Sequence, residues 1–451
     1  MKKTICTILL GMCVFSVQAQ NPIIQTHYTA DPAPMVYGDT LYLYVGCDEN
    51  DAPKQSYLMR EYRLYTTTDM VNWTDHGAPL RTSAFVWSAG DASAAQCIPR
   101  NGKFYWYISS QNTQSPGSSI GVAIGDTPYG PFKDALGRGL VTNDMTTYAK
   151  HSWDDLDPTV FIDDDGQAWL YWGNGVCYRA KLNDDMISLG SGIEAIDRMD
   201  ASSFSGGFTE APWLYKRDGH YYLLYAAGFP ESIHYSMSDV AGGKWKAQGV
   251  LMPTERGSNT NHPAIIDYKG HSYFFYHNDA LPGGHSYCRS VCVEEFSYAS
   301  DGKIPELHMS DTGIVEPVGT LCPYWRTEAE TIAWSEGVTT RTDAGRGVYV
   351  TDIHDGDYIK VRCVDFGDKG ASCFTACASS RYFGGQIELR LDSKEGEVIG
   401  TLHVPYTGEW ENWREFETSV KAVTGVHDLY LVFRGKKPHT LFNLDWWKFD
   451  N

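Results

Sequence analysis

The stretch DPTVFIDDDGQAWLYWG, residues 157–173, reveals the architecture because four other segments repeat its design. Each segment runs from a polar start through a short apolar strand and a glycine turn to a second strand rich in Tyr, Trp and Phe. The others are DPAPMVYGDTLYLYVG (31–46), QCIPRNGKFYWYIS (96–109), EAPWLYKRDGHYYLLYAAG (210–228) and NHPAIIDYKGHSYFFYHN (261–278). A unit that recurs every roughly fifty to sixty-five residues predicts an all-β protein built as a five-bladed β-propeller, with one blade per repeat.

Three of the repeats begin on a carboxylate close to proline. Asp31 and Asp157 precede proline directly, and Glu210 precedes Ala211-Pro212. Because the inner strands of a propeller converge on its axis, we expect these three carboxylates to share one small pocket. Two carboxylates that flank a bond are what hydrolysis of a glycosidic linkage needs, and a third can raise the pKa of the acid.

Composition and charge narrow the class of protein. The chain has 451 residues, enough for two or three domains, and a formal net charge of −19 with no basic run. The electrostatic footprint of a nucleic-acid-binding protein is therefore missing. The 29 tyrosines and 14 tryptophans suit a protein that handles sugars, whose C–H faces stack on aromatic rings, although all-β proteins are rich in aromatic residues in general.

The N-terminus reads MKKTICTILLGMCVFSVQAQ and predicts a secretory signal peptide over residues 1–19. We therefore expect a secreted or periplasmic protein; acylation at Cys13, which follows Leu10-Gly11-Met12, is the alternative. No later apolar run is long enough to span a bilayer. Nine cysteines remain after residue 19, an odd number without a CxxC motif, so we expect buried free thiols.

The character of the sequence changes after Pro317. We expect the propeller over residues 20–322, a connector over 323–327 and a second domain over 328–451. The second domain shows alternating apolar and polar runs separated by Gly and Asp turns about every ten residues, which predicts a β-sandwich of jelly-roll type.

Three segments resemble signature motifs of glycoside hydrolase family 43 and follow its order. They are TADPAPMVYGDTLYLYVG (29–46), WDDLDPTVFIDDDGQAWLYWG (153–173) and GGFTEAPWLYKRDGHYYLLYAA (206–227). The resemblance implies a five-bladed propeller and inversion of anomeric configuration. It also implies that Asp31 is the general base, Glu210 the general acid and Asp157 the residue that tunes the acid's pKa.

Other positions resemble the arabinofuranosidase branch that acts on arabinoxylan. By that resemblance Phe229 walls the sugar pocket, Arg289 reaches the sugar and Asn261 faces the same channel. His262 resembles a histidine that supports an axial calcium ion. One departure is the run Gly46-Cys47-Asp48-Glu49, where close relatives carry histidine in place of Cys47.

The second domain resembles carbohydrate-binding module family 6. The resemblance implies a sugar held between two aromatic rings, Tyr349 and Trp410, and hydrogen-bonded by Asn443. It also implies a structural calcium ion on Glu328, Glu330 and Asp445, since hard oxygen ligands suit that ion. No organic cofactor is expected.

The sequence thus predicts a secreted, inverting exo-glycosidase that releases α-L-arabinofuranosyl groups from arabinoxylan, a plant cell-wall polysaccharide. A β-xylosidase with the same acids is the nearest alternative. A non-catalytic lectin with two sugar-binding domains is an alternative from another class, but it would need no matched acid triad. Fructan hydrolases carry Asn-Asp-Pro and Arg-Asp-Pro motifs, which are absent here.

Overall fold

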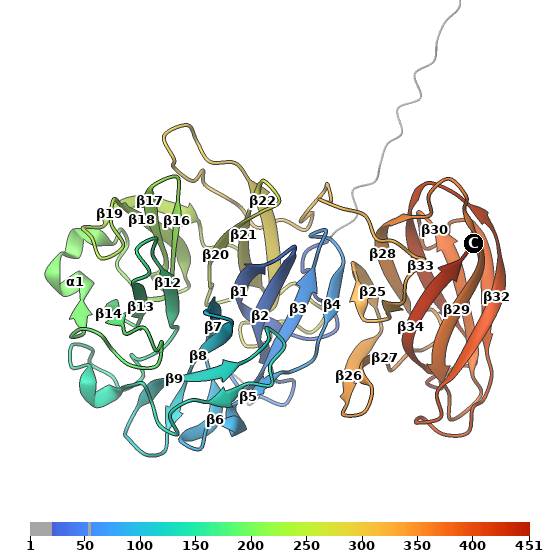
Figure 1. The fold of residues 1–451 in the computed structure, drawn as a ribbon, viewed down its shortest axis with the longest axis horizontal. Coiled ribbons are helices and arrows are strands. Elements are labelled where there is room, and N and C mark those ends of the chain that lie inside the picture. The colour runs from blue at the N-terminus through green and yellow to red at the C-terminus, as the bar shows by residue number, and fades with distance from the viewer. Residues whose placement is uncertain (1–19, 53–55) are drawn as a thin grey trace, which may run out of the picture.

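The computed structural model describes residues 20–52 and 56–451, so the predicted signal peptide lies outside the described residues. Within them the protein is almost entirely β-structure, and α1 (Ile196–Met199) is the single α-helix. Figure 1 shows two bodies side by side: a larger one that contains β1–β22 and a smaller one made of the C-terminal strands. The prediction of an all-β chain with a separate C-terminal domain is confirmed.

In the described part of the larger body, strands that follow one another in sequence form five antiparallel sheets. The first contains β1 (Thr29–Tyr37), β2 (Thr40–Asp48), β3 (Met59–Thr67), β4 (Trp73–Asp75) and β5 (Leu80–Arg81). The second contains β6 (Ser88–Ala92), β7 (Gln96–Arg100), β8 (Lys103–Asn112), β9 (Ser118–Gly125), β10 (Lys133–Asp134) and β11 (Val141–Thr142).

The remaining three sheets repeat the same meander. The third contains β12 (Thr159–Ile162), β13 (Ala168–Trp172), β14 (Tyr178–Leu182) and β15 (Glu194–Ala195). The fourth contains β16 (Glu210–Arg217), β17 (His220–Ala227), β18 (Ser232–Ser238) and β19 (Lys246–Met252). The fifth contains β20 (Ala264–Tyr268), β21 (His271–Asn278) and β22 (Ser290–Phe296).

The five repeated segments each form the first hairpin of their sheet. Their turn glycines all have positive φ, between 64° at Gly38 and 85° at Gly270. In three of the hairpins the residue before the glycine is also left-handed, as at Asn101 and Asp218. Paired left-handed residues match the right-handed twist of the flanking strands, which explains why the sequence places glycine there.

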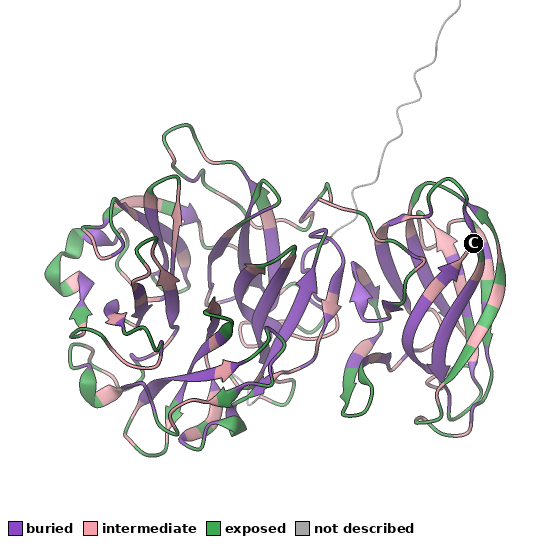
Figure 2. Cartoon of the chain, viewed as in Figure 1, coloured by how far each residue is buried: buried purple, intermediate pink, exposed green. Residues whose placement is uncertain are grey.

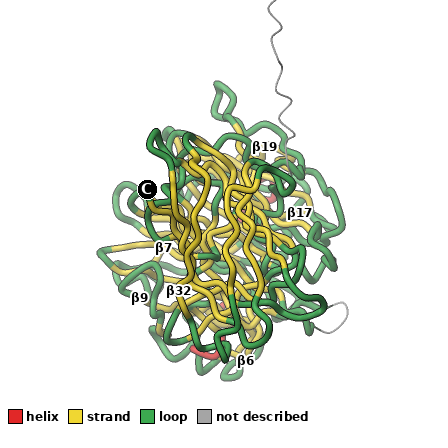
Figure 3. The backbone as a smooth tube through the Cα atoms, turned by 90° about the vertical axis from the view of Figure 1, so that its right-hand side faces the viewer, coloured by secondary structure: helices red, strands yellow, loops and turns green. Residues whose placement is uncertain are grey.

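The C-terminal domain is a sandwich of two sheets. One contains β26 (Thr339–Asp343), β27 (Gly347–Thr351), β34 (Asn443–Asp450), β29 (Ala371–Ser379) and β32 (Arg414–Val423), in that order, with β23 (Thr327–Glu328) paired to β34. The other contains β25 (Trp334–Glu336), β28 (Tyr358–Asp365), β33 (Val426–Arg434), β30 (Gly385–Leu391) and β31 (Val398–Val404). Figure 3 views the molecule from the side of this domain and shows its strands bounded by loops at both ends.

Burial explains these layers. Figure 2 shows buried residues along the inner strands and exposed ones on the loops and on β32. The sandwich encloses its own apolar cluster, which includes Phe374, Leu431 and Trp447. Alternation along a strand puts one face of each sheet into such a core and leaves the other face polar.

The two bodies are joined by backbone pairing as well as by side chains. The short strand β24 (Thr331–Ile332) pairs with β4 and so adds a strand from the C-terminal part of the chain to the first sheet. Asn72 exchanges two hydrogen bonds with the backbone of Arg362, at 2.9 and 2.8 Å. This shared strand was not predicted from the sequence, because β24 is only two residues long.

Candidate active site

The backbone is strained where the catalytic candidates enter the centre of the larger body. Asp31 and Asp157 have φ values of 54° and 56°, and Ala211, which follows Glu210, has 58°. The strand pairing shifts register at two of these places, beside Ala30 and beside Glu210. Left-handed non-glycine residues at bulges re-aim side chains and collect at functional sites. The residue directly before proline is therefore the equivalent position in the three segments, and Glu210 lies one residue N-terminal to it.

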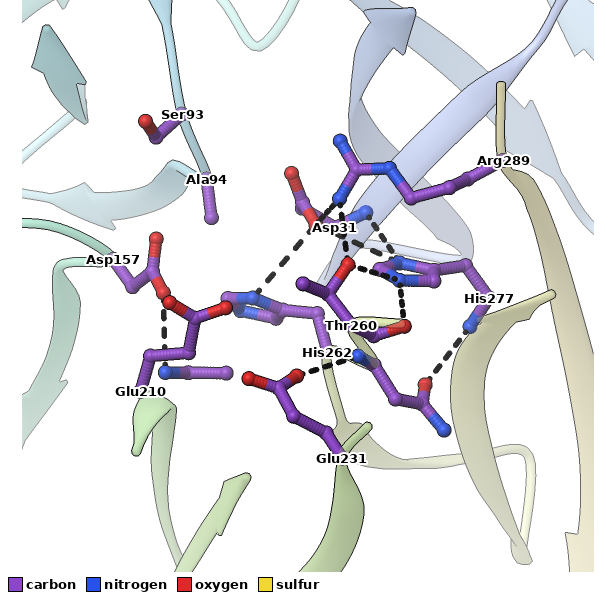
Figure 4. Close-up of polar contacts among 12 residues, drawn as sticks. Asp31, Ser93, Ala94, Asp157, Glu210, Glu231, Thr260, His262, His277 and Arg289 are labelled. Atoms are coloured by element: carbon purple, nitrogen blue, oxygen red, sulfur yellow. Dashed lines mark hydrogen bonds and ion pairs between the residues drawn. The ribbon is translucent and has the colours of Figure 1, made fainter. Parts of the chain in front are cut away.

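A cavity of about 270 Å³ receives these side chains. Asp31, Asp157 and Glu210 all line it, although Asp31 and Glu210 lie on the first and fourth sheets and Asp157 shortly precedes β12 of the third. The other lining residues are Tyr57, Met59, Ala92, Ser93, Ala94, Trp153, Leu156, Asn174, Thr260, Asn261, His262, His277 and Arg289. Figure 4 shows the carboxyl groups of Asp157 and Glu210 close together, with Asp31 facing them from the side of Arg289.

Arg289 is the cation of this cavity. Its Nη1 donates to Asp31 Oδ1 at 3.0 Å, while Nη2 and Nε donate to the two carboxylate oxygens of Asp48 at 2.8 and 2.9 Å. The guanidinium also lies over the ring of Tyr57, 4.9 Å from its centroid. A planar fork held on two sides is fixed in orientation, so Arg289 holds the Asp31 carboxylate in place.

The three carboxyl groups have raised pKa values for different balances of causes. Burial raises the pKa of Asp31 to about 6, while Arg289 opposes the rise. Burial also raises the pKa of Glu210, against hydrogen bonds that favour its ionised form. Burial and the charges of Glu210 and Asp31 raise the pKa of Asp157 well above its usual range. Raised carboxyl pKa values are what a general acid working near neutral pH requires.

Two buried histidines in the cavity are neutral. Burial and the charge of Arg289 lower the pKa of His262 to about 3 and that of His277 well below its usual value. His277 Nδ1 accepts from the backbone N–H of Asp31 at 3.3 Å, and Nε2 lies 2.8 Å from Thr260 O, to which it donates. Both ring nitrogens of His277 therefore have partners, and one of these partners is the backbone N–H of Asp31.

Several residues at the cavity were missed by the sequence analysis. Asn174 donates a hydrogen bond to Glu210 from the third sheet. Trp153 is half exposed, lines the cavity and stacks on His151 with ring centroids 4.2 Å apart. Asp48, which anchors Arg289, stands in the run where Cys47 departs from the expected histidine. Trp153 is the first residue of the motif 153–173, but no feature of the neighbouring sequence indicated that its side chain would line a cavity.

The structure places Phe229 outside the cavity lining. Its side chain is 70% exposed at the turn between β17 and β18. Asn261 and Arg289 line the cavity, where we expected them; His262, expected to support a calcium ion, lines it too, and Tyr57 and Trp153 line it in place of Phe229.

In the C-terminal domain Tyr349 and Asn443 lie on the paired strands β27 and β34, and Trp410 lies in the loop before β32. Asn443 begins β34, between the strand that carries Tyr349 and β29. Its Oδ1 accepts from Thr351 at 2.7 Å. Tyr349 packs edge-on against Trp413, with centroids 5.2 Å apart, and Trp410 packs edge-on against Tyr382 at 5.7 Å. The domain that carries the Asn443 amide thus also holds two pairs of packed aromatic side chains, Tyr349 with Trp413 and Trp410 with Tyr382.

The calcium candidates of this domain carry a specific signature. Glu330 Oε2 and Asp445 Oδ1 are buried and have no hydrogen-bond partner. Burial, and after it the charges of Glu328, Asp75 and Asp445, raises the pKa of Glu330 to about 10. Orphaned carboxylate oxygens fit a hard cation. However, no group of three His, Cys, Asp or Glu side chains within 20–52 and 56–451 could hold a metal ion. Arginines also pair with Asp445 and Glu328. Backbone oxygens would therefore have to complete the coordination of a calcium ion.

Other predictions are resolved more simply. All nine cysteines after residue 19 are free; Cys47, Cys97, Cys177, Cys288, Cys292 and Cys377 are buried, while Cys322 is exposed and Cys363 and Cys373 are partly exposed. None of the helices in the described parts of the chain has the length and apolar character needed to cross a membrane. A larger cavity of about 770 Å³, lined partly by Tyr28 and Thr339, lies where the two bodies meet and contains none of the three catalytic candidates.

A cavity that collects carboxylates from the first, third and fourth repeats has the groups that hydrolysis of a glycosidic bond needs. Comparison with known proteins agrees. Residues 19–304 match glycosyl hydrolases family 43, and residues 328–451 match carbohydrate binding module family 6. The chain belongs to glycosyl hydrolases family 43, whose fold is of the propeller type, and carries a C-terminal family 6 module.

Three relatives match along nearly the whole chain. An arabinoxylan arabinofuranohydrolase of Paenibacillus polymyxa is 34% identical over 95% of this chain and 74% of that protein. One from Bacillus subtilis (strain 168) is 33% identical over 95% of this chain and 92% of that protein. The crystal structure of a family 43 arabinoxylan arabinofuranohydrolase from Bacillus subtilis with cellotetraose superposes with a TM-score of 0.83, at 32% identity, covering 96% of this chain and 98% of that one.

Proposed function

We propose that this hydrolase removes single α-L-arabinofuranosyl groups from arabinoxylan with inversion of configuration. The observation that carries the proposal is the meeting of Asp31, Asp157 and Glu210 in one cavity of about 270 Å³. Ligand pockets commonly span roughly 300–1,000 Å³, so this one suits a single sugar unit and an exo mode of attack. The names of the relatives that match both domains favour an arabinofuranosyl group over the xylosyl group of a β-xylosidase.

We propose the following chemistry for the residues at the site. Asp31 accepts a proton from a water molecule whose oxygen attacks the anomeric carbon. The bond from that carbon to the leaving oxygen breaks, and Glu210 gives its proton to this oxygen. Inversion requires room for the water, which implies a separation of roughly 6.5–9.5 Å between the two carboxyl groups.

The neighbours of these two groups keep each in its required protonation state. Arg289 stabilises the ionised form of Asp31, the form that a base needs. Asp157 Oδ2 accepts from the backbone N–H of Ala211 at 3.1 Å, which fixes the strand entrance that carries Glu210. The nearby carboxyl group of Asp157 also disfavours ionisation of Glu210, because like charges repel, until Glu210 gives its proton to the leaving oxygen.

We further propose that the five sheets are five blades over residues 20–322, joined through 323–327 to a jelly-roll module over 328–451. The module would hold xylan through Tyr349, Trp410 and Asn443 and bind calcium through Glu330 and Asp445, with Glu328 beside them. His262 lines the cavity 3.9 Å from Asp31 Oδ1, and its neutral ring is the group that would support an axial calcium ion there. We also propose export through the segment 1–19.

Analysis of the products from a cereal arabinoxylan tests this function. We expect free arabinose, loss of arabinofuranosyl signals from the NMR spectrum of the polymer, and an initial product of inverted configuration. Release of xylose alone would replace the proposal with a β-xylosidase. Binding without release of any sugar would support the lectin alternative.

A further inference from the structure

A fourth carboxyl group, Glu231, stands behind the proposed acid. It lies between β17 and β18, and its side chain is 3% exposed. Figure 4 shows its carboxyl group and that of Glu210 pointing into the same space from neighbouring elements. Glu231 does not line the substrate cavity. A buried carboxyl group costs free energy unless its charge is compensated, so its position requires an explanation.

The hydrogen bonds of Glu231 leave one oxygen for Glu210. Its Oε2 accepts from the backbone N–H of Asn261 at 2.7 Å, and its own N–H donates to Asn259 O at 3.0 Å. Oε1 is therefore the oxygen that is free to carry a proton toward Glu210. A carboxyl group that accepts at one oxygen can donate from the other only when it is protonated.

The charges around Glu231 also favour its protonated form. Four carboxyl groups share this region, while the two cavity histidines are neutral and Arg289 is already paired with Asp48 and Asp31. The other charged and titratable groups that line the cavity are Asp31, Tyr57, Asp157, His262, His277 and Arg289, and Asp48 is paired with Arg289. Burial first, and then repulsion by Glu210, raises the pKa of Glu231 well above its usual range.

We propose that Glu231 is a positioning residue that remains protonated and donates a hydrogen bond to Glu210. When Glu210 passes its proton to the leaving oxygen, it becomes a carboxylate, and the O–H of Glu231 stabilises that new charge. No covalent bond other than the O–H bond of Glu210 changes at this pair. The donor costs little reorganisation because Asn261 already holds its other oxygen.

A hydrogen bond donated by Glu231 would favour the ionised form of Glu210 and the protonated form of Glu231. The inference rests on the proposed role of Glu210 as general acid. It adds a residue that neither the repeated motifs nor the first hairpins of the sheets contain.

The test compares Glu231→Gln with Glu231→Ala in the full chain. Glutamine keeps a donor at the same place, so we expect kcat on arabinoxylan within about threefold of wild type. Alanine removes the donor, and we expect a loss of roughly tenfold to hundredfold, the range for a hydrogen bond to a charged group. The loss should be much smaller on aryl arabinofuranosides with activated leaving groups, which need little protonation. In the alanine variant the basic limb of the pH profile should move to higher pH.

Glu294→Gln is the matched control, because Glu294 is also a partly buried carboxyl group but bonds to Tyr276 and Ser310 away from the cavity. Difference infrared spectroscopy at neutral pH gives a readout that does not depend on the substrate. We expect a protonated carboxyl band in wild type and Glu294→Gln that is lost in Glu231→Gln. No loss of this band, or equal loss of activity in the glutamine and alanine variants, would overturn the proposal. If the band is lost but Glu210→Ala is active, the proposed acid is wrong instead.

Discussion

Arg289 and Asp31 are 258 residues apart in sequence, yet Nη1 of one lies 3.0 Å from Oδ1 of the other. The remaining nitrogens of the guanidinium are held by Asp48, so the arginine cannot turn away from the base. This contact lowers the pKa of a carboxyl group that burial alone would raise further. Asp31, the proposed base, is thus held beside a cation that directly precedes β22 of the fifth sheet.

The acidic limb of the pH profile should report Asp31. Activity on arabinoxylan should rise through about pH 6, since the base works only when it is ionised. Replacing Arg289 with Gln removes the charge that favours ionisation, so this limb should move to higher pH, by about one unit or more. Arg289→Lys keeps a charge and should move it less. A limb that is the same in wild type and Arg289→Gln would show that Asp31 is not the group being titrated.

The leaving group should distinguish the acid from the base. Glu210→Ala should lose roughly 10²–10⁴-fold on arabinoxylan but retain more activity on activated aryl arabinofuranosides. Asp31→Ala should lose activity on both substrates, because nothing activates the water. Steady-state kinetics on the two substrates measure this. Equal losses on both substrates in Glu210→Ala would remove it from the role of acid.

Trp153 and Phe229 form a matched pair of exposed aromatic residues. Trp153 lines the cavity and Phe229 does not, although Phe229 is the more exposed. Trp153→Ala should raise KM about tenfold for a simple aryl arabinofuranoside, since stacking on a ring is lost. Phe229→Ala should leave that KM within about twofold. Thermal unfolding of both variants checks that neither change disturbs the fold; the reverse order of effects would restore Phe229 as the wall.

Calcium should change the pH dependence of stability through Glu330. Without a cation its folded pKa of about 10 lies above the unfolded value of about 4.3. The folded state then binds the extra proton, so stability falls as pH rises between these two values. Calcium should raise the melting temperature at pH 8 and release a proton. Glu330→Gln should abolish both effects while raising the Tm of the calcium-free protein. Calorimetry with and without a chelator measures this. A rise in Tm on adding calcium that persists in the variant would place the ion elsewhere.

Local features of the sequence predicted most of the fold and the three acidic site residues. Gly102 and Gly219 follow left-handed residues in tight hairpins, and the proline beside Asp31 and Asp157 marks a strained strand entrance. Such features depend only on residues that are neighbours in the chain. The glycine turn can be recognised because it recurs in five segments. The same locality explains why alternation and turns revealed the C-terminal sandwich.

Long-range packing settled what no short segment encodes. The hold of Arg289 on Asp31, the place of Glu231 behind Glu210 and the addition of β24 to the first sheet all join residues whose partners lie on other elements. Phe229 was expected to wall the pocket by resemblance to the arabinofuranosidase branch, but its side chain is exposed at the turn after β17. Contacts of this kind follow from the path of loops and the closure of the sheets around one centre, which residue spacing does not specify.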